Sequence, residues 1–315
     1  MNLRDIFRGT DVRAPALNRA TTWLNSDPLT SADLQRHVVA YDFWTYTCVN
    51  WLRTLPYLRA WSARYREHGL IVLGIHTPEF SFEHELANVE HAIGADRIDY
   101  PVVVDNEYAI WRAFDNHYWP ALYLANADGV ISHRQFGEGG YAEAERVIQQ
   151  LLNQGGARDL PRGLVDVAPE GAEVAADWDQ VGSPETYLGR ARGGRGFAAD
   201  RQNLQLNHWA LDGGWTTRQD SVVLEEGAGT IAYRFRARDV NLVLASTRGE
   251  TPFRALIDGR PPGTSHGADC DQAGHGVVSA PRLYQLIRQR DPIDEQTFEI
   301  TFAAPGVAAY AFTFG

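Results

Sequence analysis

The sequence contains no lysine and very little sulfur. All 29 basic residues are arginine, which excludes Schiff-base and lysine acid–base chemistry. The 315 residues include two cysteines, Cys48 and Cys270, and one methionine. Two cysteines are too few for a disulfide framework, although a single bridge between them would be possible. Any sulfur chemistry must therefore depend on one or both of these two thiols.

Long apolar runs are also missing. No stretch approaches the ~20 apolar residues that span a bilayer, and residues 1–5 lack the apolar core of a signal peptide. We therefore expect no membrane span, and either a cytoplasmic chain or one written without its leader. The formal net charge of −11 disfavours nucleic acid and anionic membranes as partners.

The first half of the sequence alternates apolar runs with amphipathic stretches, a pattern typical of an α/β sheet. Its length allows a second domain as well. The residues Asn126–Gly129 are a strong turn signal and predict a hairpin. The expected strands cover 38–43, 70–76, 101–104, 121–125 and 130–136, and the expected helices cover 52–66, 82–93, 107–114 and 142–153.

The second half has a different pattern. Residues 156–183 are rich in glycine and proline and are expected to form a linker. After the linker, short apolar runs are separated by turn residues without a helical pattern, which predicts an antiparallel β-sandwich. The expected strands there cover 230–236, 241–245, 253–257, 282–288, 297–302 and 308–314. The predicted domains are therefore 1–155 and 184–315.

Cys48 lies where the first expected strand meets the first expected helix. Unpaired N–H groups and a partial positive charge at a helix N-terminus favour thiolate over thiol. In a C-x-x-C redox pair the second sulfur would stand three residues later, and that position is Trp51. The sequence thus offers the setting of a disulfide enzyme with one of its two thiols.

The segments Thr22–Asn25, Pro28–Thr30, Asp42–Cys48, Gly74–Phe80, Tyr118–Ala121 and Phe136–Gly139 carry a resemblance that covers residues 20–153. Together they resemble the TlpA/DipZ-like branch of the thioredoxin-fold family.

The second half resembles the carbohydrate-binding-module-like, jelly-roll β-domain that follows the thioredoxin domain in DipZ-type proteins. The matching segments are Pro184–Gly189, Asp258–Gly263 and Pro281–Leu286. Such relatives work on the extracytoplasmic side, whereas the absent leader and the single active-site thiol favour the cytoplasm, where external reductants are abundant.

The resemblance implies a role for each matching residue. Cys48 matches the nucleophilic cysteine, and Trp51 replaces the resolving cysteine and would wall the site. Asp42 matches a buried carboxylate that assists proton transfer. Pro120 matches a cis-proline that faces the nucleophile, and Trp119 would supply backbone contacts to a thiol substrate. No bound cofactor is implied.

Three functions remain open for Cys48. It would exchange disulfides by a monothiol route with a small thiol or a thiol/disulfide protein as partner, or react with peroxide as a one-cysteine peroxidase. The third hypothesis is a catalytically silent scaffold in which Cys48 is a small buried hydrophobe. The peroxidase hypothesis depends on Thr45, a residue that would orient peroxide, but Tyr41 stands where peroxidases of this kind have proline. Thr45 is otherwise a polar residue of the first turn.

Two carboxylates have alternative interpretations. Asp42 lies in an apolar strand, so burial would raise its pKa and let it exchange protons with a thiol. It would instead be an ordinary buried carboxylate if the hydroxyl groups of Tyr46 or Thr47 satisfied it. Glu79 follows a strand end, where α/β sheets place functional groups, or is a solvated loop residue.

The predicted sandwich offers weaker signals. The segment from His266 to His275 contains Asp269, Cys270 and Asp271, which suggest calcium or zinc ligands, but their spacing favours a polar turn, and we expect no metal. Exposed aromatic residues would bind a glycan or a protein ligand, whereas buried ones belong to the core. The candidates are Tyr187, Trp209, Trp215 and Tyr284.

Overall fold

A computed structural model describes residues 12–20, 22–201, 203–290 and 292–315. They form two compact units. The first unit comprises the described residues up to 79 together with residues 83–168, and the second comprises residues 80–82 and 169–315. Within the described ranges, no helix is long and apolar enough to cross a membrane.

The first unit contains a mixed sheet of six strands in the order β1-β4-β3-β2-β5-β6. The central strands β2 and β3 are parallel, and β5 and β6 form the antiparallel hairpin expected around Asn126–Gly129. This arrangement confirms the α/β thioredoxin-like fold. The strands are β1 (Thr22–Leu24), β2 (Val38–Trp44), β3 (Leu70–His76), β4 (Val102–Val104), β5 (Ala121–Ala125) and β6 (Ile131–Phe136).

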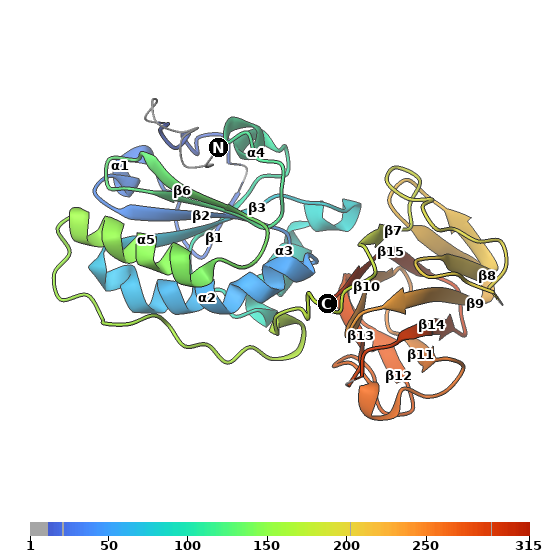
Figure 1. Ribbon diagram of the computed structural model, residues 1–315. Coiled ribbons are helices and arrows are strands. Elements are labelled where there is room, and N and C mark those ends of the chain that lie inside the picture. Colours follow the sequence, from blue (N-terminus) through green and yellow to red (C-terminus); the bar gives the residue numbers. More distant parts are fainter. Residues whose placement is uncertain (1–11, 21, 202, 291) are drawn as a thin grey trace, which may run out of the picture. The chain divides into compact units, whose positions relative to one another are not determined.

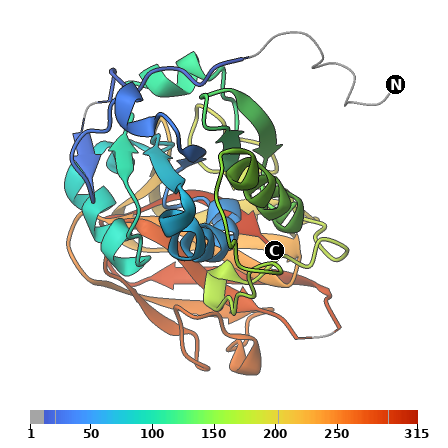
Figure 2. The ribbon, with the colours of Figure 1, turned by 90° about the vertical axis from the view of Figure 1, so that its left-hand side faces the viewer.

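Helices cover both faces of this sheet. Figures 1 and 2 show α2 (Val49–Tyr65) beside α5 (Tyr141–Gln154), and both contact the central strands. On the other face, Phe114 at the end of α4 (Ala109–Ala113) packs against Tyr41 and Phe43 of β2. Every residue of β2 is buried, because its two faces both meet helices. The short helices α1 (Ser31–Leu34) and α3 (Leu86–Ala95) complete the unit.

The second unit is an all-antiparallel β-structure, which confirms the expected sandwich. Its long strand β9 pairs with β15 through Val222 and Val223, and with β14 from Gly229 onward, so it passes from one layer to the other. The strands are β7 (Thr186–Tyr187), β8 (Trp209–Thr217), β9 (Val222–Arg236), β10 (Asp239–Ser246), β11 (Thr251–Ile257), β12 (His275–Val278), β13 (Arg282–Arg288), β14 (Glu295–Phe302) and β15 (Val307–Phe314).

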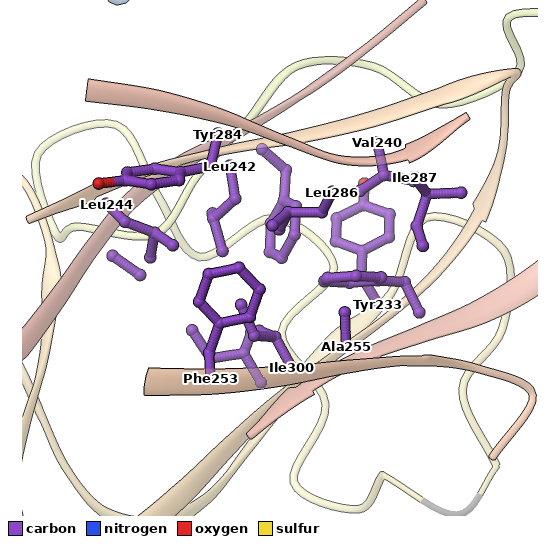
Figure 3. Close-up of a cluster of buried hydrophobic side chains, with 14 of the residues drawn as sticks. Tyr233, Val240, Leu242, Leu244, Phe253, Ala255, Tyr284, Leu286, Ile287 and Ile300 are labelled. Carbon is purple, nitrogen blue, oxygen red and sulfur yellow. The ribbon is translucent and has the colours of Figure 1, made fainter. Parts of the chain in front are cut away.

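The core of the second unit lies between these layers. Figure 3 shows Leu242 and Tyr284, from β10 and β13, facing Phe253 and Ile300 from β11 and β14. All four side chains are at most 3% exposed. Burial of such large apolar side chains is worth roughly 1.5–3 kcal/mol each, so this interior holds the sandwich together.

One predicted helix, over residues 82–93, is confirmed from residue 86 onward, but its predicted start is wrong. The chain instead forms a short 3₁₀ helix, Ser81–His84, and then begins α3 at Leu86. The break has a physical cause, because Glu83 turns inward and accepts hydrogen bonds from Thr47 Oγ1 and from the backbone N–H of Glu79. In the predicted helix Glu83 would face solvent, whereas in the structure its carboxylate is completely buried.

Candidate functional site

Cys48 occupies the junction between β2 and α2. It is the N-cap residue of α2, in an extended backbone conformation, and its carbonyl accepts the first helical hydrogen bond from Leu52 N–H at 3.0 Å. Its own N–H donates to the carbonyl of Thr45 at 3.2 Å, which closes the turn after the strand. The thiol is partly exposed. The expected strand-to-helix setting of the thiol is therefore present.

The Cys48 thiol faces the loop before β5. Its Sγ lies 3.6 Å from the carbonyl oxygen of Trp119, and the peptide bond between Trp119 and Pro120 is cis. Gly137 N–H donates to the Pro120 carbonyl at 2.9 Å and ties this loop to the end of β6. The structure thus brings Cys48 together with Trp119 and Pro120, the pair that the sequence proposed for substrate docking.

Trp51 and Asp42 meet inside the unit. Both are completely buried, and the indole Nε1–H of Trp51 donates to Asp42 Oδ2 at 2.9 Å. Burial raises the pKa of Asp42 to about 7, and the hydrogen bond from Trp51 opposes the rise. Trp51 is therefore an interior partner of the carboxylate rather than a surface wall. Neither Tyr46 nor Thr47 satisfies Asp42, so that alternative is wrong, and Thr47 bonds Glu83 instead.

Other polar side chains share this interior without hydrogen-bond partners. Trp44 stacks on Trp51 with ring centroids 4.3 Å apart, and the ring of His76 lies edge-on to Trp44 at 4.9 Å. Both ring nitrogens of His76, the indole nitrogen of Trp44 and Asp42 Oδ1 are buried without a partner in the described residues. Burial lowers the pKa of His76 to about 3, so the ring is neutral at physiological pH. The region behind the thiol is thus unusually polar for a core.

A glycine makes room for this interior. A Cβ added at Gly74 of β3 would lie 2.8 Å from Trp44 Nε1 and 3.2 Å from Val102 Cγ2. Contacts below 3.0 Å require a neighbour to move. Gly74 therefore leaves room for the large indole of Trp44 beside β3, which the sequence segment alone did not indicate.

Three further buried charged side chains, Arg53, Glu138 and Glu83, were not predicted from the sequence. Arg53 of α2 forms an ion pair with Glu138 at 2.9 Å, and their side chains are only 2% and 8% exposed. Glu83 holds Thr47, the residue before Cys48, through a 2.6 Å hydrogen bond. No local pattern marks these residues, because each partner lies tens of positions away along the chain.

Thr45 and Glu79 are the other two predicted residues of this region. Thr45 is completely buried, and its hydroxyl has no partner in the described part of the chain. Glu79 is partly buried, and its backbone N–H donates to Glu83.

In the second unit, candidate metal ligands of the segment 266–275 form hydrogen bonds with backbone groups of a turn. Asp271 accepts backbone N–H groups from Ala273 and His275, and His266 Nδ1 lies within 3 Å of two backbone carbonyls. Throughout the ranges that the structure describes, no group of three or more His, Cys, Asp or Glu residues is placed to hold a metal ion. Cys270 is also buried and free, and its thiol donates to the Leu286 carbonyl at 3.0 Å.

The aromatic candidates for ligand binding are mostly interior. Trp209 is 3% exposed and Tyr284 is completely buried, whereas Trp215 packs edge-on against Phe302 of the core. Tyr187 is partly exposed, and the guanidinium of Arg192 lies over its ring at 4.9 Å. Most of these rings therefore belong to the core.

Comparisons with known proteins cover both units. Residues 183–315 match the family model described as "Thioredoxin like C-terminal domain". Protein DipZ of Mycobacterium tuberculosis and Protein DipZ of Mycobacterium bovis are each 32% identical over 318 residues, which is 96% of this chain and 43% of theirs. The chain thus spans less than half the length of these relatives.

Two shorter proteins resemble the first unit. Thiol-disulfide oxidoreductase YkuV of Bacillus subtilis is 24% identical over 138 residues, which is 44% of this chain and 93% of that protein. A solution structure of a thioredoxin-like protein in its oxidized form is 24% identical and covers 45% of this chain and 95% of its own, with a TM-score of 0.42.

Proposed function

We propose that this chain, which is similar to Protein DipZ over 96% of its length, exchanges thiols and disulfides through Cys48 alone, with an external thiol as reductant. One observation carries the proposal. The position of the resolving cysteine is Trp51, whose side chain is buried and bonded to Asp42. No second sulfur from that position can attack a disulfide formed on Cys48.

In the proposed exchange, all electrons come from external thiols, so no cofactor is needed. The Cys48 thiolate attacks a substrate disulfide, forms a mixed disulfide and releases one substrate thiolate. An external thiolate then attacks the Cys48 sulfur and releases the second substrate thiolate. A second external thiol removes the first from Cys48, so two external thiols are oxidised to one disulfide for each substrate disulfide reduced.

The neighbouring groups have supporting roles in this proposal. The partly exposed thiol lies beside the Trp119 carbonyl, where the backbone on either side of Pro120 would align an extended thiol substrate. Asp42 would tune proton transfer near the site, since its charge changes close to neutral pH. In this proposal the partner is a small thiol or a thiol/disulfide protein, and a glycan or protein ligand would bind at the sandwich.

Alkylation of Cys48 against pH tests the proposal. In a Cys270→Ser background, the rate should report a thiolate pKa well below the ~8.5 of a free cysteine. Glutathione disulfide should then produce a mixed disulfide, seen by intact mass, that added glutathione removes. A Cys48→Ser variant is the matched control. Slow labelling with a pKa at or above ~8.5, and no adduct, would refute the exchange function.

A Trp51→Cys variant tests whether the missing thiol at position 51 alone prevents internal resolution of the mixed disulfide. Under the proposal, the variant gains a thiol that resolves the mixed disulfide internally, so the glutathione adduct should disappear without added reductant. An adduct as long-lived as that of the parent protein would contradict the assigned role of position 51. Rapid formation of sulfenic acid with peroxide, without disulfide exchange, would instead favour the peroxidase alternative.

A further inference from the structure

A hollow of about 390 Å³ lies in the second unit, beside the segment that precedes the sandwich. Its lining is dominated by cationic and polar side chains, although the whole chain carries a net charge of −11. Its lining includes Val174, Arg238, Thr264, His266, Arg288 and Arg290.

Two of these arginines share one buried carboxylate. Arg288 Nε and Nη2 lie 2.7 and 3.1 Å from the two oxygens of Asp239, and Arg238 Nη2 lies 2.7 Å from Oδ2. The Asp239 side chain is 2% exposed, and the arginines are 21% and 27% exposed. Two guanidinium groups on one carboxylate leave a net positive charge where solvent screens it poorly.

Backbone contacts fix these guanidinium groups in place. Arg238 Nη2 also donates to the Ala175 carbonyl at 2.7 Å, and Arg288 Nη2 donates to the Gly171 carbonyl at 3.0 Å. The side chains therefore need little reordering to receive an anion, which lowers the entropic cost of binding. Val174, from the same segment, lines the hollow.

Arg290 adds a further positive charge at the rim. It is exposed and forms no ion pair with any residue in the described ranges. Guanidinium groups present paired N–H donors that match carboxylate and phosphate oxygens. Three arginines, Arg238, Arg288 and Arg290, stand against the single carboxylate of Asp239, so these four side chains have an excess of two positive charges.

The remaining polar groups fit a hydroxyl group. His266 Nδ1 lies 2.9 and 2.8 Å from the carbonyl oxygens of Gly267 and Cys270, so Nδ1 is a donor. In the uncharged tautomer with its proton on Nδ1, Nε2 is an acceptor. Thr264 contributes a hydroxyl that donates or accepts. A bare anion would not use an acceptor nitrogen, but a hydroxylated anion would.

We propose that this hollow binds a small hydroxylated organic anion, whose carboxylate or phosphate meets the arginines while a hydroxyl meets His266 and Thr264. The site is distinct from Cys48 and does not depend on the redox proposal. Sugar acids and sugar phosphates share this chemistry, and a comparison of one ligand from each class distinguishes them.

Calorimetric titration of the full chain tests the proposal with glucuronate, glucose 6-phosphate, inorganic phosphate and glucose. Glucuronate or glucose 6-phosphate should bind saturably and more tightly than inorganic phosphate, and glucose should not bind. The preferred ligand shows whether the anion is a carboxylate or a phosphate. Equal binding of glucose, binding of inorganic phosphate alone, or no saturable binding would overturn the proposal.

Matched variants locate the binding. Arg290→Gln should weaken the preferred ligand about tenfold, as expected for loss of a charge-assisted hydrogen bond. Arg254→Gln removes an exposed arginine of β11 outside the hollow and should leave affinity unchanged. Thr264→Val should also weaken binding. Both lining residues are exposed, so the variants should fold, which circular dichroism checks. Equal affinities of Arg290→Gln and Arg254→Gln would contradict the assigned site.

Limited proteolysis gives a second readout, independent of binding heat. Because Arg238 and Arg288 hold the carbonyls of Ala175 and Gly171, a bound anion should slow cleavage after Glu173 by a glutamate-specific protease. The protection should disappear in Arg290→Gln and persist in Arg254→Gln. Ligand-independent cleavage would contradict binding beside this segment.

Discussion

Replacing Asp42 by asparagine should stabilise the first unit, and the gain should depend on pH. The carboxyl is completely buried, and its pKa is raised from 3.8 to about 7. Each tenfold change in proton affinity is worth about 1.4 kcal/mol, so ionising Asp42 in the folded state costs about 4 kcal/mol relative to the unfolded chain. Asparagine keeps the shape and an acceptor for Trp51 but cannot ionise.

The sign of the effect follows from proton binding. Between pH ~4 and ~7 the folded state holds the Asp42 proton more tightly than the unfolded chain, so this group's contribution to stability falls as pH rises. His76 acts in the opposite direction. Its pKa is lowered to about 3, so the unfolded chain binds the extra proton below pH ~6.5, and stability rises with pH there. The two effects largely cancel in the parent protein.

The difference between parent and variant isolates Asp42, because His76 is present in both. Hydrogen exchange of peptides from β2 and β3 measures the free energy of opening within the first unit. The Asp42→Asn variant should be about 4 kcal/mol more stable at pH 8.5 and nearly equal to the parent at pH 4. A difference that does not change with pH would refute the assignment of a raised pKa to this carboxyl.

Three further outcomes are expected. Gly74→Ala should destabilise the first unit by about 1–3 kcal/mol through overpacking against Trp44, and an unchanged calorimetric melting temperature would argue against that contact. Arg53→Met should cost about 3–5 kcal/mol by leaving Glu138 buried without its ion-pair partner; adding Glu138→Gln should recover part of the loss in a double-mutant cycle. In a Cys48→Ser background, native Cys270 should resist iodoacetamide at pH 8, because burial raises its pKa to about 11. Labelling without denaturant would contradict this burial.

The central strands and the position of the thiol could be predicted from the sequence because their signals are local. The apolar runs predicted β2 and β3 almost to their ends. The strand β8 was missed because register shifts at Gly213 and Gly214 interrupt its alternation. The strand β1 was also missed, since its three residues owe their pairing to β4 rather than to a pattern of their own.

In the candidate site, too, the features with a local sequence signal were predicted and those that depend on distant residues were not. A carboxylate within an apolar strand indicated that Asp42 would be unusual, and the spacing to Trp51 indicated a missing thiol. The hydrogen bond between them was not foreseen, because it requires the helix α2 to place an indole against the strand. Glu83 was missed for a similar reason, since its burial depends on Thr47, which is 36 positions away.

The stack of Trp44 on Trp51 gives the interior an optical reporter. The Trp51 ring nitrogen is bonded to a carboxyl that ionises near neutral pH, and its ring lies 4.3 Å from a second indole. Indole emission responds to a charge placed at the ring nitrogen, so the intrinsic fluorescence should follow the proton on Asp42 without an added dye. Trp51 is also three residues from Cys48 in the sequence, and a group attached to that thiol should alter the surroundings of the same chromophore. Under the proposed function, the residue in the place of a second sulfur would thereby report events at the first one by light.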